Sequence, residues 1–254
     1  MISKIKAKIK ELLNVTPNDN IEYNVKIWDD YAKNWDYKTI DVENEIIDDA
    51  KRKEYLEFIG NEWGVLKDAA EIIDDYLLKY VNKDSIVGEI GIGGGRIANI
   101  VAPKVKKLYG FDVAGEMLKK ASKALSQHNN IEYVHLKGSK FDSKLEKSFD
   151  MIFSFDVFVH LDLHNIWTYF KEINKALKDN GKVFLHTSNL TTQDGWDRFK
   201  VQDRYWPGGF YFITPETIDT LAKRAGFKII KHSEIDSSNF YYSRDYLFVM
   251  EKIK

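Results

Sequence analysis

The amino-acid sequence predicts an α/β fold, with a mostly parallel seven-stranded sheet and helices on both faces. Beyond Asp84, short runs rich in β-branched and aromatic residues alternate with helical stretches, which is typical of parallel strands joined by helices. Only about ten residues separate the last two runs, and they show no helical pattern, so the final strand is expected to run antiparallel to its neighbour. The predicted strands are Ile86–Ile90, Lys107–Asp112, Ile131–Leu136, Phe149–Phe155, Lys182–Thr187, Lys228–Ile235 and Tyr246–Ile253.

The first 82 residues are expected to form a helical extension or lid, followed by a main domain over residues 83–254. The last stretch of the extension, Leu66–Val81, has apolar residues near helical spacing. At the very N-terminus, apolar residues surrounded by lysines share one helical face. This amphipathic pattern suits docking on the protein's own domain or a partner subunit, and also a membrane surface. The apolar residues of that face are Ile2, Ile5, Ile9 and Leu12.

Composition and charge exclude several classes of function. The 38 basic and 39 acidic side chains give a formal net charge of −1, so no general positive field is available to hold a nucleic acid. The chain has no cysteine, which excludes disulfides and thiolate metal sites. No apolar run approaches the roughly 20 residues that span a bilayer. A cytoplasmic protein without an integral membrane segment is expected, and a homodimer is left open.

A glycine-rich turn follows the first predicted strand, and a helical run starts at Ile97. Glycines let the chain turn sharply and approach a ligand where a Cβ would collide, and the start of the helix offers free N–H groups. Asp112 ends the second predicted strand, 21 residues after Gly91, where its carboxylate can accept both hydroxyls of a ribose. The turn and the acid together predict a site for an adenosine-containing ligand.

Two common nucleotide sites do not fit this turn. The dinucleotide fingerprint ends in a small residue that lets the helix pack closely on the strand, but Arg96 stands at that position. A kinase-type phosphate loop ends in a lysine followed by serine or threonine, and that pair is absent from the turn. A nicotinamide or flavin cofactor and a nucleoside triphosphate are therefore disfavoured.

The turn resembles motif I of the class I S-adenosylmethionine-dependent methyltransferases, which share a Rossmann-like sheet. The segment from Phe111 to Leu118 is similar to the family's ribose and adenine segment, and that from Phe149 to Leu161 to its fourth-strand segment. The resemblance covers residues 84–253. It implies S-adenosyl-L-methionine (SAM) as cofactor, bound by Glu89, Gly91, Gly93, Gly95, Asp112, Val113, Met117, Gly138, Ser139, Ser154 and Phe155.

The resemblance also implies two less regular cofactor contacts. The family often has an aspartate or asparagine where Lys137 stands, so backbone amides near Gly138 and Ser139 are expected to read the adenine edge. In similar methyltransferases an N-terminal helix with aromatic residues folds over the cofactor. Here Trp28, Tyr31 and Trp35 share one helical face, and Tyr31 and Trp35 are predicted to close the site. Packing in the core would give the same pattern.

Two histidines are the candidate general bases. Methyl transfer requires that the acceptor be aligned with the cofactor and lose a proton. His160 follows the fourth predicted strand and His186 ends the fifth, at the edge where an acceptor would meet the cofactor's methyl group. A structural role stays open for each of them. His160 and His164 also have a spacing that could hold a metal, but a third ligand is not evident, so no metal is predicted.

The segment from the end of the fifth strand to the next helix, residues 189–213, is too long for a simple connection. Long loops at the carboxyl ends of strands often build binding sites, and aromatic and arginine side chains suit sugars, phosphates or carboxylates. We therefore expect an acceptor-binding insert, whose candidate contact residues are Arg198, Arg204, Tyr205, Trp206 and Tyr211.

The expected function is the transfer of a methyl group from SAM to a small polar acceptor. The motifs typical of the family's DNA-adenine and protein-arginine enzymes are absent from the sequence. The leading hypothesis is O-methylation of a sugar, a nucleotide-linked sugar or a phosphorylated precursor, and the resemblance adds a surface-polysaccharide or secondary-metabolite pathway. N-methylation of a small amine and a SAM-binding subunit without catalytic activity stay open as alternatives.

Overall fold

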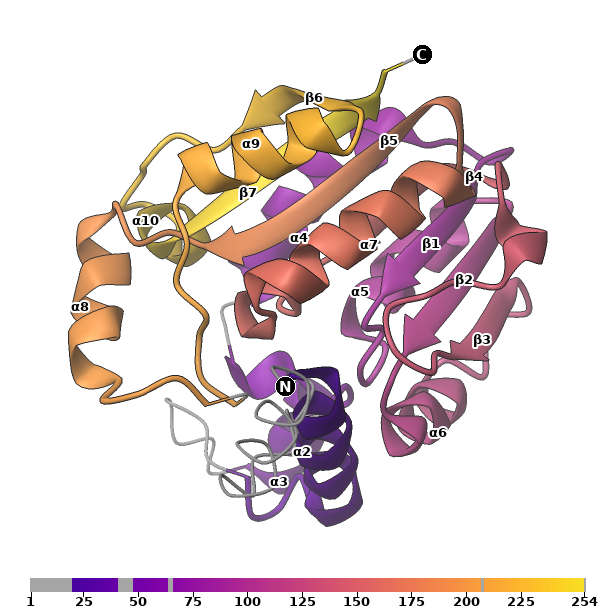
Figure 1. The fold of residues 1–254 in the computed structure, drawn as a ribbon. Helices are drawn as coiled ribbons and strands as arrows, with labels where there is room; N and C mark the ends of the chain where they lie inside the picture. The colour runs from indigo at the N-terminus through magenta and orange to yellow at the C-terminus, as the bar shows by residue number, and fades with distance from the viewer. Residues whose placement is uncertain (1–19, 41–47, 64–65, 207, 254) are drawn as a thin grey trace, which may run out of the picture.

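The computed structural model describes residues 20–40, 48–63, 66–206 and 208–253. The predicted α/β fold is confirmed, because seven strands form one sheet in the order β3-β2-β1-β4-β5-β7-β6 with helices on both faces (Figure 1). The amphipathic pattern predicted from Ile2 to Leu12 lies outside the described residues and stays a prediction. No helix in the described ranges is both long and apolar enough to cross a membrane.

The strands follow the predicted ranges closely. The largest difference is at β5, which begins at Leu177 and not at Lys182. Leu177 pairs with Phe149 of β4, and the register then shifts before Met151. Residues 178–181 are polar or glycine, so no apolar run in the sequence marks this first part of the strand. The strands are β1 Ile86–Ile90, β2 Lys107–Asp112, β3 Ile131–His135, β4 Phe149–Ser154, β5 Leu177–Ser188, β6 Phe227–His232 and β7 Asp245–Lys252.

The last strand is antiparallel, as predicted. β7 runs antiparallel to both of its neighbours, β5 and β6, and the other neighbouring pairs are parallel. The expectation that the connection before β7 contains no helix was wrong, because a short helix, α10 (Phe240–Arg244), lies there. The helix starts after Asn239, whose side chain accepts the N–H of Tyr241. Five residues are too few for a helical periodicity to be visible in the sequence.

Two hydrophobic clusters cover the two faces of the sheet. Helices α4 (Leu66–Tyr76), α5 (Arg96–Val101), α6 (Gly115–Ala124) and α10 contribute to the cluster on one face, and α7 (Leu163–Ala176) and α9 (Pro215–Arg224) to the other (Figure 1). Neighbouring residues of one strand point to opposite clusters, as Met151 and Ile152 of β4 do. Burial on both faces explains why these strands read as apolar runs.

The N-terminal helices lie beyond the carboxyl ends of the strands, where α2 (Asn20–Asn34) and α3 (Asp49–Tyr55) are seen in Figure 1. Oδ1 of Asp29 accepts the N–H of Glu116 at the start of α6, at 2.8 Å. Nδ2 of Asn20 donates to the carbonyl of His160, at 3.2 Å. These contacts hold α2 at the edge of the sheet where α/β proteins bind ligands. The predicted domain boundary near residue 82 stays a prediction. Helix α4 precedes that residue in the chain, yet it packs on the sheet of the main domain.

Candidate active site

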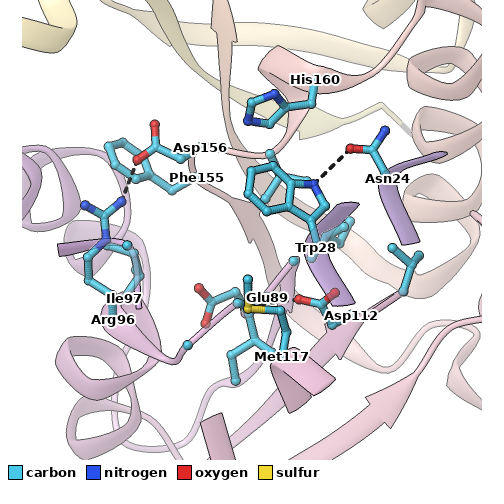
Figure 2. A pocket seen from close by; sticks show the side chains of 18 of the residues that line it. Asn24, Trp28, Glu89, Arg96, Ile97, Asp112, Met117, Phe155, Asp156 and His160 are labelled. Atoms are coloured by element: carbon cyan, nitrogen blue, oxygen red, sulfur yellow. Dashed lines mark hydrogen bonds and ion pairs between the residues drawn. The ribbon is translucent and has the colours of Figure 1, made fainter. Parts of the chain in front are cut away.

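A cavity lies at the carboxyl ends of β1, β2 and β4 (Figure 2). Its volume, with its open mouth included, is about 880 Å³. β2 and β3 lie on one side of β1 and β4 on the other, so the order of the strands reverses at the cavity, and open α/β sheets bind ligands at such a point. Seven of the predicted cofactor-binding residues line the cavity, namely Glu89, Gly91, Gly93, Asp112, Val113, Met117 and Phe155.

The glycine-rich turn brings bare backbone to the cavity. Gly91, Gly93 and Gly95 have positive φ angles of 74°, 55° and 94°, which glycine adopts without strain. A Cβ on Gly94 would lie only 2.7 Å from the backbone nitrogen of Ile59, so this part of the turn is closely packed. A Cβ on Gly93 would meet no described atom within 4 Å, so Gly93 leaves space for a ligand to approach the backbone.

Asp112 presents both carboxylate oxygens at the end of β2. Oδ2 accepts the N–H of Gly93 at 2.9 Å, and Oδ1 accepts the N–H of Ala114 at 2.8 Å. Each oxygen keeps a lone pair that can accept a ribose hydroxyl. Burial raises the pKa of Asp112 to about 6.

Glu89 is the second acid of the cavity, and Figure 2 shows it between Arg96 and Asp112. Its side chain is buried, and Oε2 makes no hydrogen bond with any described residue. Burial raises the pKa of this carboxyl well above its usual value. Because an unsatisfied buried polar atom costs about 1–3 kcal/mol, Oε2 is available to hydrogen-bond a molecule in the cavity. Open space at Gly93, two acceptors on Asp112 and this acid fit a nucleoside that carries an amino acid, which is the composition of SAM.

One wall of the cavity comes from the N-terminal part of the chain. This N-terminal wall consists of six residues, and Trp28 is its central side chain in Figure 2. The indole Nε1 of Trp28 donates to Oδ1 of Asn24 at 2.9 Å, and its ring lies 5.1 Å from that of His160 and 5.6 Å from that of Trp63. The residues of the wall are Ile21, Asn24, Trp28, Ile59, Gly60 and Trp63.

The aromatic residues predicted to close the site, Tyr31 and Trp35, do not line this cavity. The hydroxyl of Tyr31 and Nε1 of Trp35 both donate to Oε1 of Glu62, at 2.6 and 2.9 Å. Oε2 of the same carboxylate accepts the N–H of Gly60 at 2.9 Å. These two residues therefore fasten α2 to the segment of residues 59–63, and Trp28 on the same face of α2 reaches the cavity.

Four other predicted cofactor contacts lie outside the cavity lining. The hydroxyl of Ser154 donates to the carbonyl of Ile90 at 2.7 Å, which fixes β4 to β1. A Cβ on Gly95 would lie 2.6 Å from Leu125, so Gly95 permits close packing of the turn. After β3 the cavity is lined by Leu136. The predicted contacts outside the lining are Gly95, Gly138, Ser139 and Ser154.

Of the two predicted bases, His160 lines the cavity. Its Nδ1 lies 2.8 Å from the carbonyl oxygen of Gly209, and because a carbonyl can only accept, Nδ1 carries the hydrogen. Nε2 is then the acceptor of the neutral ring. Desolvation lowers the pKa of His160 to about 4, so the imidazole is neutral near pH 7. No three possible metal ligands gather among the described residues.

His186 is fully buried and lies outside the cavity lining. In its neutral form Nδ1 accepts the backbone N–H of Asp156 at 3.1 Å, and Nε2, which then carries the hydrogen, lies 3.0 Å from Oδ2 of Asp245. Burial opposes the charged form, but the carboxylates of Asp245 and Asp156 raise the pKa of His186 to about 8. The structure therefore does not bring the two predicted bases together.

The sequence interpretation missed two charged residues that line the cavity, Arg96 and Asp156. They form the ion pair seen in Figure 2. Burial favours the neutral acid, but His186 and Arg96 hold the pKa of Asp156 below its usual range. Asp156, directly after the fourth strand, could have signalled this ion pair. Arg96 served in the sequence analysis only as the reason to exclude a dinucleotide.

The predicted acceptor-binding insert contains α8 (Gln193–Val201), and none of its five candidate residues lines the cavity. Two of them lie next to His160. The guanidinium of Arg198 lies 4.0 Å from the ring centre of Phe210, which itself packs against His160. The hydroxyl of Tyr205 donates to the carbonyl of His160 at 3.2 Å. Tyr211 packs against Tyr205 with the ring centres 5.5 Å apart. The remaining two, Arg204 and Trp206, are exposed.

The sheet order, the cavity at the reversal point and the glycine-rich turn beside Asp112 define a Rossmann-like, nucleoside-binding α/β protein. A family model described as "Methyltransferase domain" matches residues 88–185. The solved S-adenosylmethionine-dependent methyltransferase of Clostridium acetobutylicum superposes with a TM-score of 0.60 at 16% identity, covering 81% of this chain and 98% of that one. These comparisons support a SAM-dependent methyltransferase domain, an enzyme whose cofactor is SAM, on the fold that the sequence predicted.

Two similar proteins have a more specific description. Phosphoethanolamine N-methyltransferase of Plasmodium falciparum (isolate 3D7) is 28% identical over 178 residues, which are 68% of this chain and 63% of the relative's length. The solved phosphoethanolamine N-methyltransferase 1 of Haemonchus contortus, in complex with phosphoethanolamine and S-adenosylhomocysteine, superposes with a TM-score of 0.68 at 16% identity. It covers 94% of this chain and 50% of that one, so this chain spans only part of each relative.

Proposed function

We propose that the protein methylates the nitrogen of a small amine that carries a phosphate or a similar anionic group. The observation that carries this proposal is a neutral His160 at the cavity, connected through Phe210 to the cationic Arg198. Both side chains contact Phe210, with the imidazole centre 5.8 Å and the guanidinium carbon 4.0 Å from the centre of that ring. A weak proton acceptor that lines the cavity and a guanidinium outside its lining thus pack on the same aromatic ring.

The lowered basicity of His160 favours nitrogen over oxygen as the methylated atom. An alkylammonium group such as that of lysine has a pKa of about 10.4, whereas water, which resembles an alcohol in acidity, has a pKa of about 15.7. With a pKa of about 4, the imidazole of His160 is a poor base for a hydroxyl. An amine needs less help, because it already exists in part as the free base. This reasoning favours the amine over the O-methylation that the sequence suggested.

Arg198 supports the anionic part of the proposal. Its guanidinium makes no hydrogen bond or ion pair with any described residue, so its donors are available to a ligand. Arg244 lies 4.8 Å from the centre of the same Phe210 ring, but its guanidinium is paired with Asp245, so Arg198 is the cation available here. Guanidinium groups bind phosphates and carboxylates through paired hydrogen bonds. The relatives named for phosphoethanolamine agree with an acceptor of this kind.

The chain's own residues have separate parts in the proposed reaction. SAM, when bound, supplies the methyl group as an electrophile. Asp112 and Glu89 would hold the two ends of the cofactor by hydrogen bonds, and Trp28 would exclude water from the cavity. Nε2 of His160 accepts a hydrogen bond from an N–H of the free-base amine and so orients its lone pair, and the proton that the methylated nitrogen then carries is released to solvent. The N-terminal wall would thus serve as the lid that the sequence predicted.

The test is a comparison of acceptors with the purified protein and SAM, with products identified by mass spectrometry. We expect transfer to phosphoethanolamine and slower transfer to ethanolamine, which lacks the phosphate. Transfer to phosphorylated sugars alone would establish O-methylation instead. Binding of S-adenosylhomocysteine without transfer to any acceptor would support the non-catalytic alternative.

Replacing Arg198 by methionine tests the anion site separately. Loss of a charge-assisted hydrogen bond costs about 1.5–3 kcal/mol, so we expect R198M to raise the KM for phosphoethanolamine at least about tenfold, with a much smaller change in kcat. Lys200 lies on the same helix, is exposed and pairs with Asp197, so K200M is the matched control. Equal KM values for R198M and K200M would show that Arg198 does not bind the acceptor.

A further inference from the structure

A chain of buried charged groups lies behind one side of the cavity. Arg96 of α5 pairs with Asp156 after β4, and Asp156 contacts His186 of β5. On the other side of His186, Asp245 of β7 accepts hydrogen bonds from Nε of Arg244, at 2.9 and 3.0 Å. The chain begins at the cavity, because Arg96 and Asp156 line it, and ends at Arg244, which packs on Phe210.

His186 is the central member of this chain and is enclosed on all sides that the structure describes. Its ring centre lies 4.9 Å from that of Phe155 and 5.5 Å from that of Tyr241. The side chain is fully buried. An acceptor in the cavity therefore meets Phe155 and Asp156 before it could reach the imidazole.

Asp156 has a backbone conformation that needs support. Its φ angle is 58°, in the left-handed region, which costs a residue with a Cβ about 1–2 kcal/mol. The carboxylate is held by Arg96 and by the hydroxyl of Tyr241, at 3.2 Å. In the neutral ring, with the hydrogen on Nε2 facing Asp245, the backbone N–H donates to Nδ1 of His186 at 3.1 Å, so the neutral imidazole holds the main chain of Asp156 itself.

We propose that His186 is a positioning residue of the cofactor site. It fixes the backbone of Asp156, and through Asp156 it places the Arg96 guanidinium at the cavity wall. In this role His186 acts through Asp156 and exchanges no proton with the acceptor. The inference rests on the methyltransferase activity and on the cavity, and it holds for an amine or a hydroxyl acceptor alike.

Three substitutions separate the two nitrogen atoms of the ring. In H186N the side-chain oxygen can take the place of Nδ1 and accept the N–H of Asp156. In H186Q the longer amide reaches toward Asp245 but leaves that N–H without an acceptor, and H186L removes both contacts. Calorimetry with S-adenosylhomocysteine reports cofactor affinity without an acceptor, so its outcome does not depend on the proposed amine specificity.

We expect H186Q and H186L to bind S-adenosylhomocysteine at least about tenfold more weakly than wild type, and H186N to stay within about threefold, because only H186N satisfies the buried amide. The titrations are done at about pH 9, where the ring of His186, whose pKa is raised to about 8, is neutral and Nδ1 can accept. Unchanged affinity in H186Q would overturn the proposal, even if its melting temperature fell, since that is the result of a purely structural role. So would normal affinity with lost turnover in H186N, which is the result expected of a general base. Should H186L fail to fold, the comparison of H186N with H186Q decides alone.

Discussion

Replacing Asp112 by asparagine tests the electrostatics of the cofactor cavity. Burial raises the pKa of Asp112 from 3.8 to about 6, so the folded protein without cofactor holds this proton more tightly than the unfolded chain does. The stabilising effect of the proton is complete below about pH 4 and is lost as the pH rises to about 6. A shift of about 2 units corresponds to about 3 kcal/mol. Asparagine does not titrate and should not show this loss.

The assay is urea unfolding of wild type and D112N without cofactor, at several values between pH 4 and pH 7. Asparagine has one acceptor oxygen, so D112N also loses one of the two backbone contacts, at a cost of about 1 kcal/mol at every pH. Between pH 4 and pH 7 the free energy of unfolding of wild type should therefore fall by about 3 kcal/mol relative to that of D112N. If the free energies of unfolding of wild type and D112N changed with pH in parallel, the reasoning that burial raises the pKa of Asp112 would be refuted. D112N should also bind S-adenosylhomocysteine at least about tenfold more weakly at pH 7.

Three other substitutions test the packing around the cavity. G94A would bring a Cβ to within 2.7 Å of the backbone of Ile59 in the N-terminal wall and displace that wall. Calorimetry should therefore show S-adenosylhomocysteine binding about tenfold more weakly, and normal binding would contradict the contact. F153A empties a fully buried position in β4 and should lower the free energy of unfolding in urea by about 3–5 kcal/mol; a loss below 1 kcal/mol would contradict its place in the core. Y205F removes the hydroxyl that bonds Asn20 and the carbonyl of His160, so limited proteolysis within α2 should become faster, and an unchanged rate would show that this contact does not hold the helix.

The strands could be predicted from the sequence because each depends on a local pattern. Runs such as Phe149–Ser154 are apolar throughout since both faces of the sheet are covered, and the glycine turns and helical stretches mark their ends. Helix α10 was missed because a five-residue helix shows no periodicity. The order of the strands and the pairing of β5 with β7 depend on contacts between distant segments, which no local pattern records.

The site divides in the same way. Asp112 and the glycine-rich turn could be found because a strand, a turn and a second strand specify their neighbourhood. The sequence could not show which of His160 and His186 lines the cavity. The buried position of His186 depends on Asp245, which lies far along the chain from both histidines. The stripe that contains Trp28 and Tyr31 indicated a helix face but not which aromatic residue reaches the cavity. Tyr31 is kept from the cavity by Glu62, whose carboxylate accepts a hydrogen bond from the hydroxyl of Tyr31.

Helix α2 has a consequence for biosynthesis. It is translated before the sheet, yet it is bonded to Glu116, to the carbonyl of His160 and to Tyr205, which leave the ribosome later. Since domains fold as their segments emerge, the helix has no complete set of partners until most of the polypeptide has been made. Chains released early would lack a closed SAM cavity, so interrupted translation would yield fragments that do not sequester the cofactor.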